Sequence, residues 1–308
     1  MLGMTMAIRF SKYKATFCQK TLKQSIACSG VGLHSGKDVT MRLCPAPINH
    51  GIVFHRTDIT DCKQLISARY DNVVDTKLCT VIANKDNICV GTIEHLMAAF
   101  AGCEINNALV EVDCTELAIM DGSSEPFVCM IDCAGIVEQD APRQVIEIRK
   151  PITVDIDDKR VTLSPSNCYA IDFEIDFASK AIGRTVWGVE MVNGTFRHEI
   201  AQARTFGLLE EVERLQANGL ARGGSLDNAI VVDGDKVLNH EGLRFKDEFV
   251  RHKVLDCVGD LYLAVAPLIG RVNAVKAGHQ INNAALRALF ADPSAYKIVD
   301  YEDSHAIE

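Results

Sequence analysis

The sequence predicts an α+β protein built from two halves of similar design. Both halves of the 308-residue chain combine strand patterns, in which apolar and polar residues alternate, with helical patterns. Around residues 138–143 the segment EQDAPR interrupts these patterns with charge and a proline, so we place a domain boundary there. The halves also share a short echo, because Gly102 follows His95 and Gly259 follows His252 by the same interval. Such a repeat would bring two equivalent helices to one interface, each with a histidine.

The first half predicts a hairpin, further strands and one buried helix. Residues 21–45 alternate around a glycine-rich turn, which predicts a hairpin with His34 at its tip. In the segment TIEHLMAAFAG, Thr92 is a possible N-cap and Gly102 a C-terminal stop. The helix between them is apolar nearly all round, so we expect it to be buried. Strands are predicted at 78–83, 88–92 and 106–113, and a turn at 120–126.

The second half repeats this combination of strands and helices. Short strand patterns resume after the predicted boundary, and longer helical patterns follow them. We predict strands within 146–165, 169–177, 229–233 and 271–279, and helices at 199–219, 248–266 and 282–290.

Composition excludes several classes of protein. The formal charge of -9 and the absence of a dense run of Lys or Arg argue against a nucleic-acid coat or a polybasic membrane binder. The twelve cysteines lie mostly in apolar runs without a disulfide-like spacing, which favours a reducing cytoplasm. The apolar run LYLAVAPLIG is broken by Pro267 and followed by Arg271, so no transmembrane segment is expected. Residues 1–20 resemble no signal peptide, and we interpret them as an N-terminal extension of a soluble protein.

The segment FVRHKVLDCVGD carries an unusual polar face. At helical spacing His252, Asp256 and Asp260 lie on one side of the helix, and valines lie on the other. A histidine and an aspartate four residues apart can bind one cation together. A lone pair of this kind is more often a surface ion pair, and Asp260 alone could simply anchor a helix end.

His95 is the best candidate for a third ligand, because it lies at the start of a helix expected to be buried. Glu94 would point about 100° away around the helix axis, where a general base for a metal-bound water belongs. Capping of the helix is the simpler explanation for a lone Glu-His pair. The metal hypothesis is favoured because both pairs occur in otherwise apolar helices of the two halves, together with His279 after a Lys-Ala-Gly turn.

These residues lie in motifs that closely resemble those of the UDP-3-O-acyl-N-acetylglucosamine deacetylase family of Gram-negative lipid A biosynthesis. The motifs follow one another from about residue 21 to 290: GVGLHSG, DTKLCT, TIEHLMAAFAG, IMDGSSEPFV, ARTFG, RGGSLDNAIVVD, LRFKDEFVRHKVLDCVGDL and KAGH. The resemblance implies two similar two-layer α/β sandwich domains with the active site at their interface. We expect these domains at 21–140 and 141–308, with an insert near 183–220 that forms a hydrophobic passage for the acyl chain.

The resemblance also implies roles for individual residues. One Zn²⁺ per chain is expected, with Fe²⁺ as an alternative in the cell, and none of the cysteines is needed as a ligand. Cys79 of KLCT lies near the expected metal and is interpreted as a bystander. The expected metal ligands are His95, His252 and Asp256, and the expected catalytic residues are Glu94 as general base, His279 as the imidazolium, Asp260 as its carboxylate partner and Thr205 near the oxyanion.

Substrate contacts are expected mainly from the second half. Lys253 and Lys276 would meet the diphosphate or sugar, and Lys159 would hold phosphate. Phe177 would stack on the uracil, although it is equally well explained as a strand core residue. Phe206 and Leu208 are further expected contacts, with Leu208, Leu209 and Leu215 lining the acyl passage, for which helical core packing is the simpler account.

The sequence therefore predicts a cytoplasmic zinc amidase that removes acetate from a UDP-linked, 3-O-acylated N-acetylglucosamine. We expect a monomer without a nucleic-acid partner. One alternative is a nucleotide-sugar-binding protein in which the metal only braces the domain interface. Another is a zinc amidase for a different acylated sugar or peptide, since ligands alone do not identify a substrate.

Overall fold

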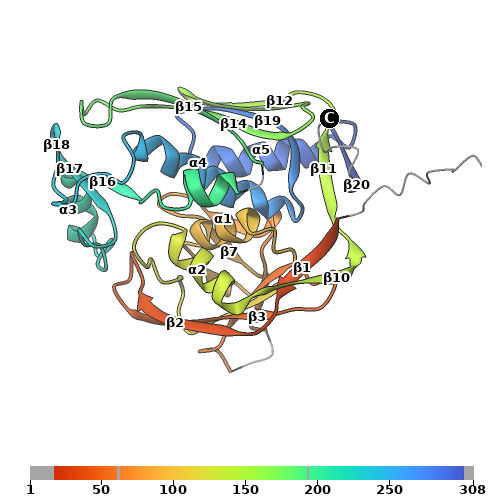
Figure 1. Ribbon diagram of the computed structural model, residues 1–308. Helices are drawn as coiled ribbons and strands as arrows, with labels where there is room; N and C mark the ends of the chain where they lie inside the picture. Colours follow the sequence, from red (N-terminus) through yellow and green to blue (C-terminus); the bar gives the residue numbers. More distant parts are fainter. Residues whose placement is uncertain (1–16, 61–62, 193, 302–308) are drawn as a thin grey trace, which may run out of the picture.

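The computed structural model describes residues 17–60, 63–192 and 194–301 (Figure 1). Two large sheets form the outer layers in this view, and the longer helices lie between them. The predicted α+β class is confirmed. Most of the predicted N-terminal extension, residues 1–16, falls outside the described residues. Within the described ranges, no helix has both the length and the apolar character that crossing a membrane requires.

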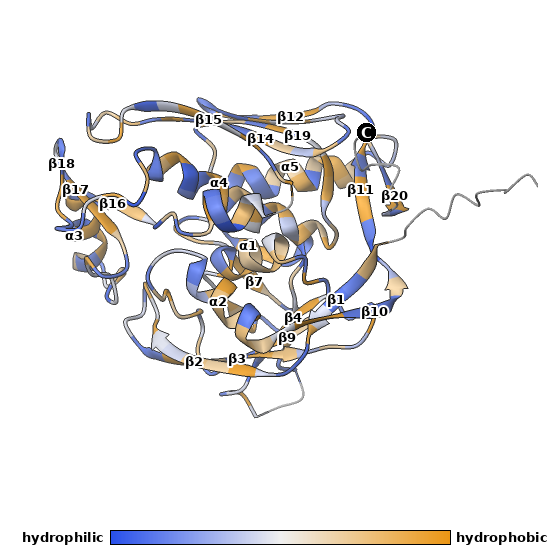
Figure 2. Cartoon of the chain, in the orientation of Figure 1, coloured by the Kyte–Doolittle hydropathy of each residue, from blue (hydrophilic) through white to orange (hydrophobic). Residues whose placement is uncertain are grey.

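The sheet of the first half has five strands, with one buried and one open face. Burial alternates along β3 (Asp38–Pro45), and Figure 2 shows both hydrophilic and hydrophobic residues in the strands of the two large sheets. The first two strands pair as the predicted hairpin, and His34 lies in the turn between them. In spatial order the strands are β2 (Ile26–Val31), β3 (Asp38–Pro45), β9 (Ala108–Val112), β4 (Ile52–Arg56) and β5 (Leu65–Ser67).

The sheet of the second half has seven strands and is centred on one long strand near the C-terminus. That strand, β19 (Leu268–Val275), pairs in parallel with β14 (Tyr169–Asp176) and β11 (Gln144–Ile148) and antiparallel with β13 (Lys159–Ser164). The strands predicted within 146–165, at 169–177 and at 271–279 are therefore present. The other strands are β11 (Gln144–Ile148), β12 (Ile152–Ile156), β13 (Lys159–Ser164), β14 (Tyr169–Asp176), β15 (Arg184–Glu190) and β20 (Tyr296–Asp300).

Three small sheets complete the strand structure. We predicted that the segment EQDAPR interrupts the strand pattern, and this is wrong. Most of the segment belongs to a strand that pairs with the start of the described chain. Residues 18–20, which we assigned to the extension, form part of that pairing. The small sheets comprise β1 (Cys18–Leu22) with β10 (Ile136–Pro142); β6 (Val73–Asp75), β7 (Val81–Ala83) and β8 (Cys89–Val90); and β16 (Phe206–Leu208), β17 (Ile230–Asp233) and β18 (Lys236–Val237).

The helices confirm most of the predicted boundaries. The helix in TIEHLMAAFAG is buried and ends at Gly102, as expected. Its predicted N-cap is wrong, because Ile93 occupies that position and Thr92 has a left-handed backbone with φ of 55°. The helices are α1 (Glu94–Gly102), α2 (Glu125–Ala134), α3 (Leu209–Ala217), α4 (Glu248–Leu261) and α5 (His279–Ala291), with short 3-10 turns at Tyr70–Asn72 and Tyr262–Ala264 and a π turn at Phe196–Ile200.

The predicted helix at 199–219 is wrong over its first half. Phe206 pairs with Ile230 in a parallel arrangement, and the N–H of Thr205 bonds to the carbonyl of Gly122. These contacts hold the segment extended in spite of its helical pattern. Within the predicted range only α3 is an α-helix, and it has no buried residues. The unit from β16 to β18 stands apart from the main body in Figure 1, whereas residues 184–190 of the expected insert belong to the large sheet.

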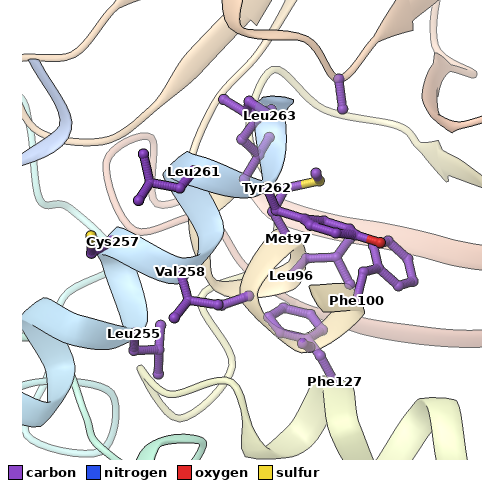
Figure 3. Close-up of a cluster of buried hydrophobic side chains, with 14 of the residues drawn as sticks. Leu96, Met97, Phe100, Phe127, Leu255, Cys257, Val258, Leu261, Tyr262 and Leu263 are labelled. Atoms are coloured by element: carbon purple, nitrogen blue, oxygen red, sulfur yellow. The ribbon is translucent and has the colours of Figure 1, made fainter. Parts of the chain in front are cut away.

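Helices α1 and α4 cross closely at the centre of the molecule. A Cβ at Gly259 would lie 2.0 Å from the carbonyl oxygen of Glu94, so only glycine permits this approach. Figure 3 shows apolar side chains of both helices beside the crossing, among them Leu96 and Phe100 from α1 and Val258 and Leu261 from α4. Gly102 and Gly259 follow their histidines at the same interval, but they do not pack in the same way. Gly102 lies against the ring of Phe196 rather than against α4.

Replacing Gly259 with alanine tests this crossing. We expect Gly259→Ala to lower the free energy of unfolding by about 1–3 kcal/mol or more, since overpacking against a backbone atom cannot be relieved by a side-chain movement. Gly278→Ala is the matched control, because a Cβ there meets nothing within 4 Å and its φ is not positive. Denaturant titration of both variants measures the difference, and equal stabilities would contradict a close helix crossing.

Candidate metal centre and active site

Three buried side chains converge where α1 crosses α4. His95 lies in the first turn of α1, and His252 and Asp256 lie on successive turns of α4. Their ligand atoms all lie within 4.8 Å of one another. Nε2 of His95 is 3.6 Å and Nε2 of His252 is 3.3 Å from the same oxygen, Oδ1 of Asp256. The structure therefore brings the three predicted ligands together.

The protonation and hydrogen bonding of these groups fit a divalent cation. Nδ1 of His252 donates to the carbonyl of Ala203 at 3.0 Å, which leaves the Nε2 lone pair directed at the cluster. Burial lowers the pKa of His252 to about 3, so the ring is neutral. Burial would raise the pKa of Asp256, but the positive charge of Lys253, whose Nζ lies 2.7 Å from Oδ2, holds it well below its usual range. A neutral imidazole and an ionised carboxylate are the forms that bind metal.

One buried oxygen of this cluster has no hydrogen-bond donor among the described residues. Oδ2 of Asp256 accepts a hydrogen bond from Nζ of Lys253 at 2.7 Å. Oδ1 has no hydrogen-bond donor in the described part of the chain, although it lies between the two imidazoles. An unsatisfied buried carboxylate oxygen is costly. A cation bound by the three side chains would satisfy it, and two imidazole nitrogens with one carboxylate oxygen suit zinc.

A buried ion pair fixes the carbonyl that orients His252. Nε of Arg204 donates to Oε1 of Glu248 at 2.9 Å, and the backbone N–H of Arg204 donates to the same oxygen at 3.0 Å. Both side chains are buried, and Glu248 is the first residue of α4. The pair therefore ties the residue after Ala203 to the start of the helix that carries His252.

Glu94 lies beside the cluster without joining it. Its Oε2 accepts the backbone N–H of Thr80 at 3.0 Å, and its Oε1 is 3.9 Å from Nε2 of His279. Burial raises the pKa of Glu94. A carboxylate with a raised pKa that faces an imidazole is suited to accept a proton near neutral pH.

His279 is held by an ion pair at the start of α5. Its Nδ1 donates to Oδ2 of Asp260 at 2.8 Å, and Asn282 donates to the same oxygen at 2.9 Å. The hydroxyl of Thr80 donates to the other oxygen at 2.5 Å. Burial alone would lower the pKa of His279, but the charges of Asp260 and Glu94 outweigh it and raise the pKa to about 9. His279 is therefore an imidazolium whose Nε2 faces Glu94.

Sequence reasoning missed the two residues that hold Asp260. Thr80 contacts both Glu94 and Asp260, and it lies in the DTKLCT segment that we singled out for other reasons. Asn282 follows His279 by three residues, a spacing that places both on one helix face and could have identified it. Cys79, next to Thr80, is buried, and burial followed by the charge of Glu94 raises its pKa to about 12. It stays a thiol outside the ligand cluster.

A small cavity of about 160 Å³ adjoins the cluster on the side of the second half. His252 forms part of its wall, and the rings of Phe177 and Phe206 meet edge to face with centroids 5.6 Å apart. Most of the predicted substrate contacts share this cavity. Its lining includes Phe177, Thr205, Phe206, Leu208, His252 and Lys253.

The two other lysines are placed differently. Nζ of Lys276 lies 3.0 Å from Asp176 and 3.3 Å from Asp158, so two carboxylates already compensate its charge. Lys159 is an exposed residue at the start of β13. Neither residue lines the 160 Å³ cavity. Leu209 and Leu215 do not line it either, and their place in an acyl passage stays a prediction.

Comparison with known proteins agrees with this geometry. A family model described as UDP-3-O-acyl N-acetylglycosamine deacetylase matches residues 19–291. The chain is 47% identical over 291 residues to a protein of Idiomarina loihiensis, with 94% of each chain covered. It is 51% identical to a protein of Acidithiobacillus ferrooxidans over 94% of this chain and 95% of that one. Both proteins are named UDP-3-O-acyl-N-acetylglucosamine deacetylase. The chain therefore belongs to the UDP-3-O-acyl-N-acetylglucosamine deacetylase family.

Proposed function

We propose that this protein removes the N-acetyl group from UDP-3-O-acyl-N-acetylglucosamine, giving acetate and a free amine for lipid A biosynthesis. Membership of the family over 94% of the chain supports the substrate and the reaction. The convergence of His95, His252 and Asp256 beside Glu94 and His279 is the single structural observation that carries the proposal. A metal that only braced an interface would need neither a base nor an acid beside it.

His95, His252 and Asp256 would hold one Zn²⁺, with Fe²⁺ as the alternative in the cell. When bound, the ion would supply Lewis acidity for the amide carbonyl and for the attacking water. The three side chains would supply three protein ligands, which is the number typical of catalytic rather than structural zinc sites.

Glu94 accepts the proton of the attacking water in this proposal. Its burial keeps the carboxylate poorly solvated and raises its pKa, which makes it a stronger base than an exposed glutamate. The backbone N–H of Thr80 fixes one oxygen and leaves Oε1 for the proton. Glu94 immediately precedes the proposed ligand His95, so the base and one proposed metal ligand lie on the same helical turn.

His279 protonates the departing amine nitrogen. The amide nitrogen is a poor leaving group unless it is protonated, so amide hydrolysis requires a positioned acid. The carboxylate of Asp260 holds Nδ1–H and favours the charged ring, which presents the Nε2 proton toward Glu94. The base and the acid therefore face one another across 3.9 Å.

The adjoining cavity suggests how substrate is held. Thr205 lies in its wall beside His252, which suits a hydroxyl near the developing oxyanion, and Lys253 offers a cation for the sugar or diphosphate. We infer that Phe177 and Phe206 contact the substrate's rings and that the unit from β16 to β18, with Leu208, forms the acyl passage. Lys159 and Lys276 would act on phosphate only if substrate reaches beyond the cavity.

We further infer that the two halves, 21–140 and 141–308, act as domains with the active site between them. The cysteines among the described residues are free thiols, which fits a reducing compartment, and we place the enzyme in the cytoplasm. A monomer would suffice for the activity, because every proposed catalytic side chain comes from one chain.

Acetate release from matched substrates tests the proposed specificity. Removing the 3-O-acyl chain should lower kcat/KM by at least ~10²-fold, because several methylenes at ~0.8 kcal/mol each are no longer buried. A chelator should abolish turnover of both substrates, and added zinc should restore it. Equal efficiency toward UDP-N-acetylglucosamine would instead favour an amidase for another acylated compound.

Two substitutions separate the base from the acid. Glu94→Gln and His279→Gln should each lower kcat by ~10²-fold or more while the metal stays bound, because neither residue is a ligand. Activity should rise as Glu94 ionises and fall as pH passes the His279 pKa of about 9, since the acid works only while protonated.

The pH profile of the His279→Gln variant supplies the control. Its residual activity should lose the decline on the basic side, whereas Glu94→Gln should keep that decline. Loss of metal from His279→Gln, or turnover like that of the unchanged protein, would show that the proposed role is wrong.

A further inference from the structure

A second, larger cavity lies at the C-terminal ends of α1 and α4. It has a volume of about 650 Å³, and its walls include Gly102 from the end of α1 and Leu261 from the end of α4. His95 lies seven residues before Gly102, which is ~10 Å along the helix at 1.5 Å per residue. The lining contains none of the proposed ligands or catalytic residues. The cavity is therefore separate from the site already described.

Arg143 lies at this cavity where the chain passes from β10 to β11. Its backbone is fixed on both sides, since its N–H donates to the carbonyl of Phe17 and its own carbonyl accepts from Tyr301, each at 2.7 Å. Its side chain is only 6% exposed. The guanidinium therefore has a fixed position between the two halves.

Among the described residues that line the cavity, cations outnumber carboxylates. The carboxylate of Glu104 accepts from Nζ of Lys20 at 2.6 Å and from Nη1 of Arg143 at 2.8 Å. One negative charge therefore compensates two positive charges. Nε of Arg143 is buried and has no acceptor among the described residues. Arg197, a third cation of the lining, already has both oxygens of Asp132, at 2.6 and 2.8 Å. The cluster of Lys20, Glu104 and Arg143 thus carries a net positive charge and an unused donor.

The remaining walls are largely apolar. Val258, Leu261 and Leu268 contribute aliphatic side chains, and the lining also includes aromatic rings such as that of Phe196. A volume of 650 Å³ is within the usual range of about 300–1,000 Å³ for small-molecule sites. An apolar enclosure with one under-compensated cationic cluster matches a ligand that has an apolar body and a single anionic group.

We propose that this cavity is a binding site for a small amphipathic carboxylate. The carboxylate contacts the guanidinium of Arg143, which supplies the charge that Glu104 leaves uncompensated. The apolar body lies against the ends of α1 and α4. This site is independent of the proposed deacetylation, since it requires neither the metal nor Glu94.

Calorimetric titration of the full chain with three probes tests the site. Octanoate carries both features, 1-octanol lacks the charge, and acetate lacks the apolar body. Octanoate should bind about tenfold or more tightly than 1-octanol, since a hydrogen bond to a charged group is worth about one factor of ten or more. Acetate should show no binding in the same range, and equal affinities for octanoate and 1-octanol would overturn the proposal.

Two variants locate the binding. Arg143→Met keeps an apolar stem and should reduce the affinity for octanoate to that for 1-octanol. Val192→Trp places an indole at the mouth of the cavity, where Val192 is 56% exposed, and should abolish binding. Val186→Trp is the matched control, because Val186 is 63% exposed, lies outside the lining and should bind octanoate normally.

Octanoate could also enter the cavity beside His252, and the variants distinguish the two sites. Binding at His252 would persist in Val192→Trp, and that result would overturn the proposal. Thermal unfolding and acetate release by each variant show whether the fold and the proposed active site are intact. A variant that releases acetate normally but no longer binds octanoate supports a separate site, whatever the natural carboxylate.

Discussion

Where α1 crosses α4, the missing side chain of Gly259 lets the backbones of the two helices come into contact. The first turn of α1 carries His95, and the middle of α4 carries His252 and Asp256, so the separation of the helix backbones sets the separation of these side chains. A longer separation would pull the imidazoles away from Oδ1 of Asp256, which now lies 3.3 and 3.6 Å from them. The apolar packing of Figure 3 stabilises the crossing.

The crossing also concentrates ionisable groups that would be costly to bury alone. Asp260 is satisfied at both oxygens, by Thr80 on one and by Asn282 and His279 on the other. Asp256 is satisfied at only one oxygen, by Lys253. Buried charges persist where partners compensate their desolvation, and the contrast between the two aspartates is compatible with a cation beside Asp256. The same network raises the pKa of His279 and so prepares its proposed role as an acid.

The sequence predicted most of the fold, because apolar periodicity reports which face of a strand or helix is buried. Periodicity also placed His252 and Asp256 on one helix face. It does not specify which other helix packs against that face, so the approach of His95 could not be predicted from periodicity. The failures share a cause in tertiary contacts. The helical pattern around Thr205 is overridden by pairing with β17, and Thr80 acquires its role only when α1 and α4 bring Glu94 and Asp260 to it.

The position of a bound ion tests this account most directly. Crystals of the protein grown with one equivalent of zinc can be measured at the zinc absorption edge, where anomalous scattering locates the metal without reference to activity. We expect one strong site per chain, bonded to Nε2 of His95, Nε2 of His252 and Oδ1 of Asp256, the atom that now has no donor within the described residues. A principal site elsewhere, for example on Cys79, or no site at the crossing of α1 and α4, would contradict it.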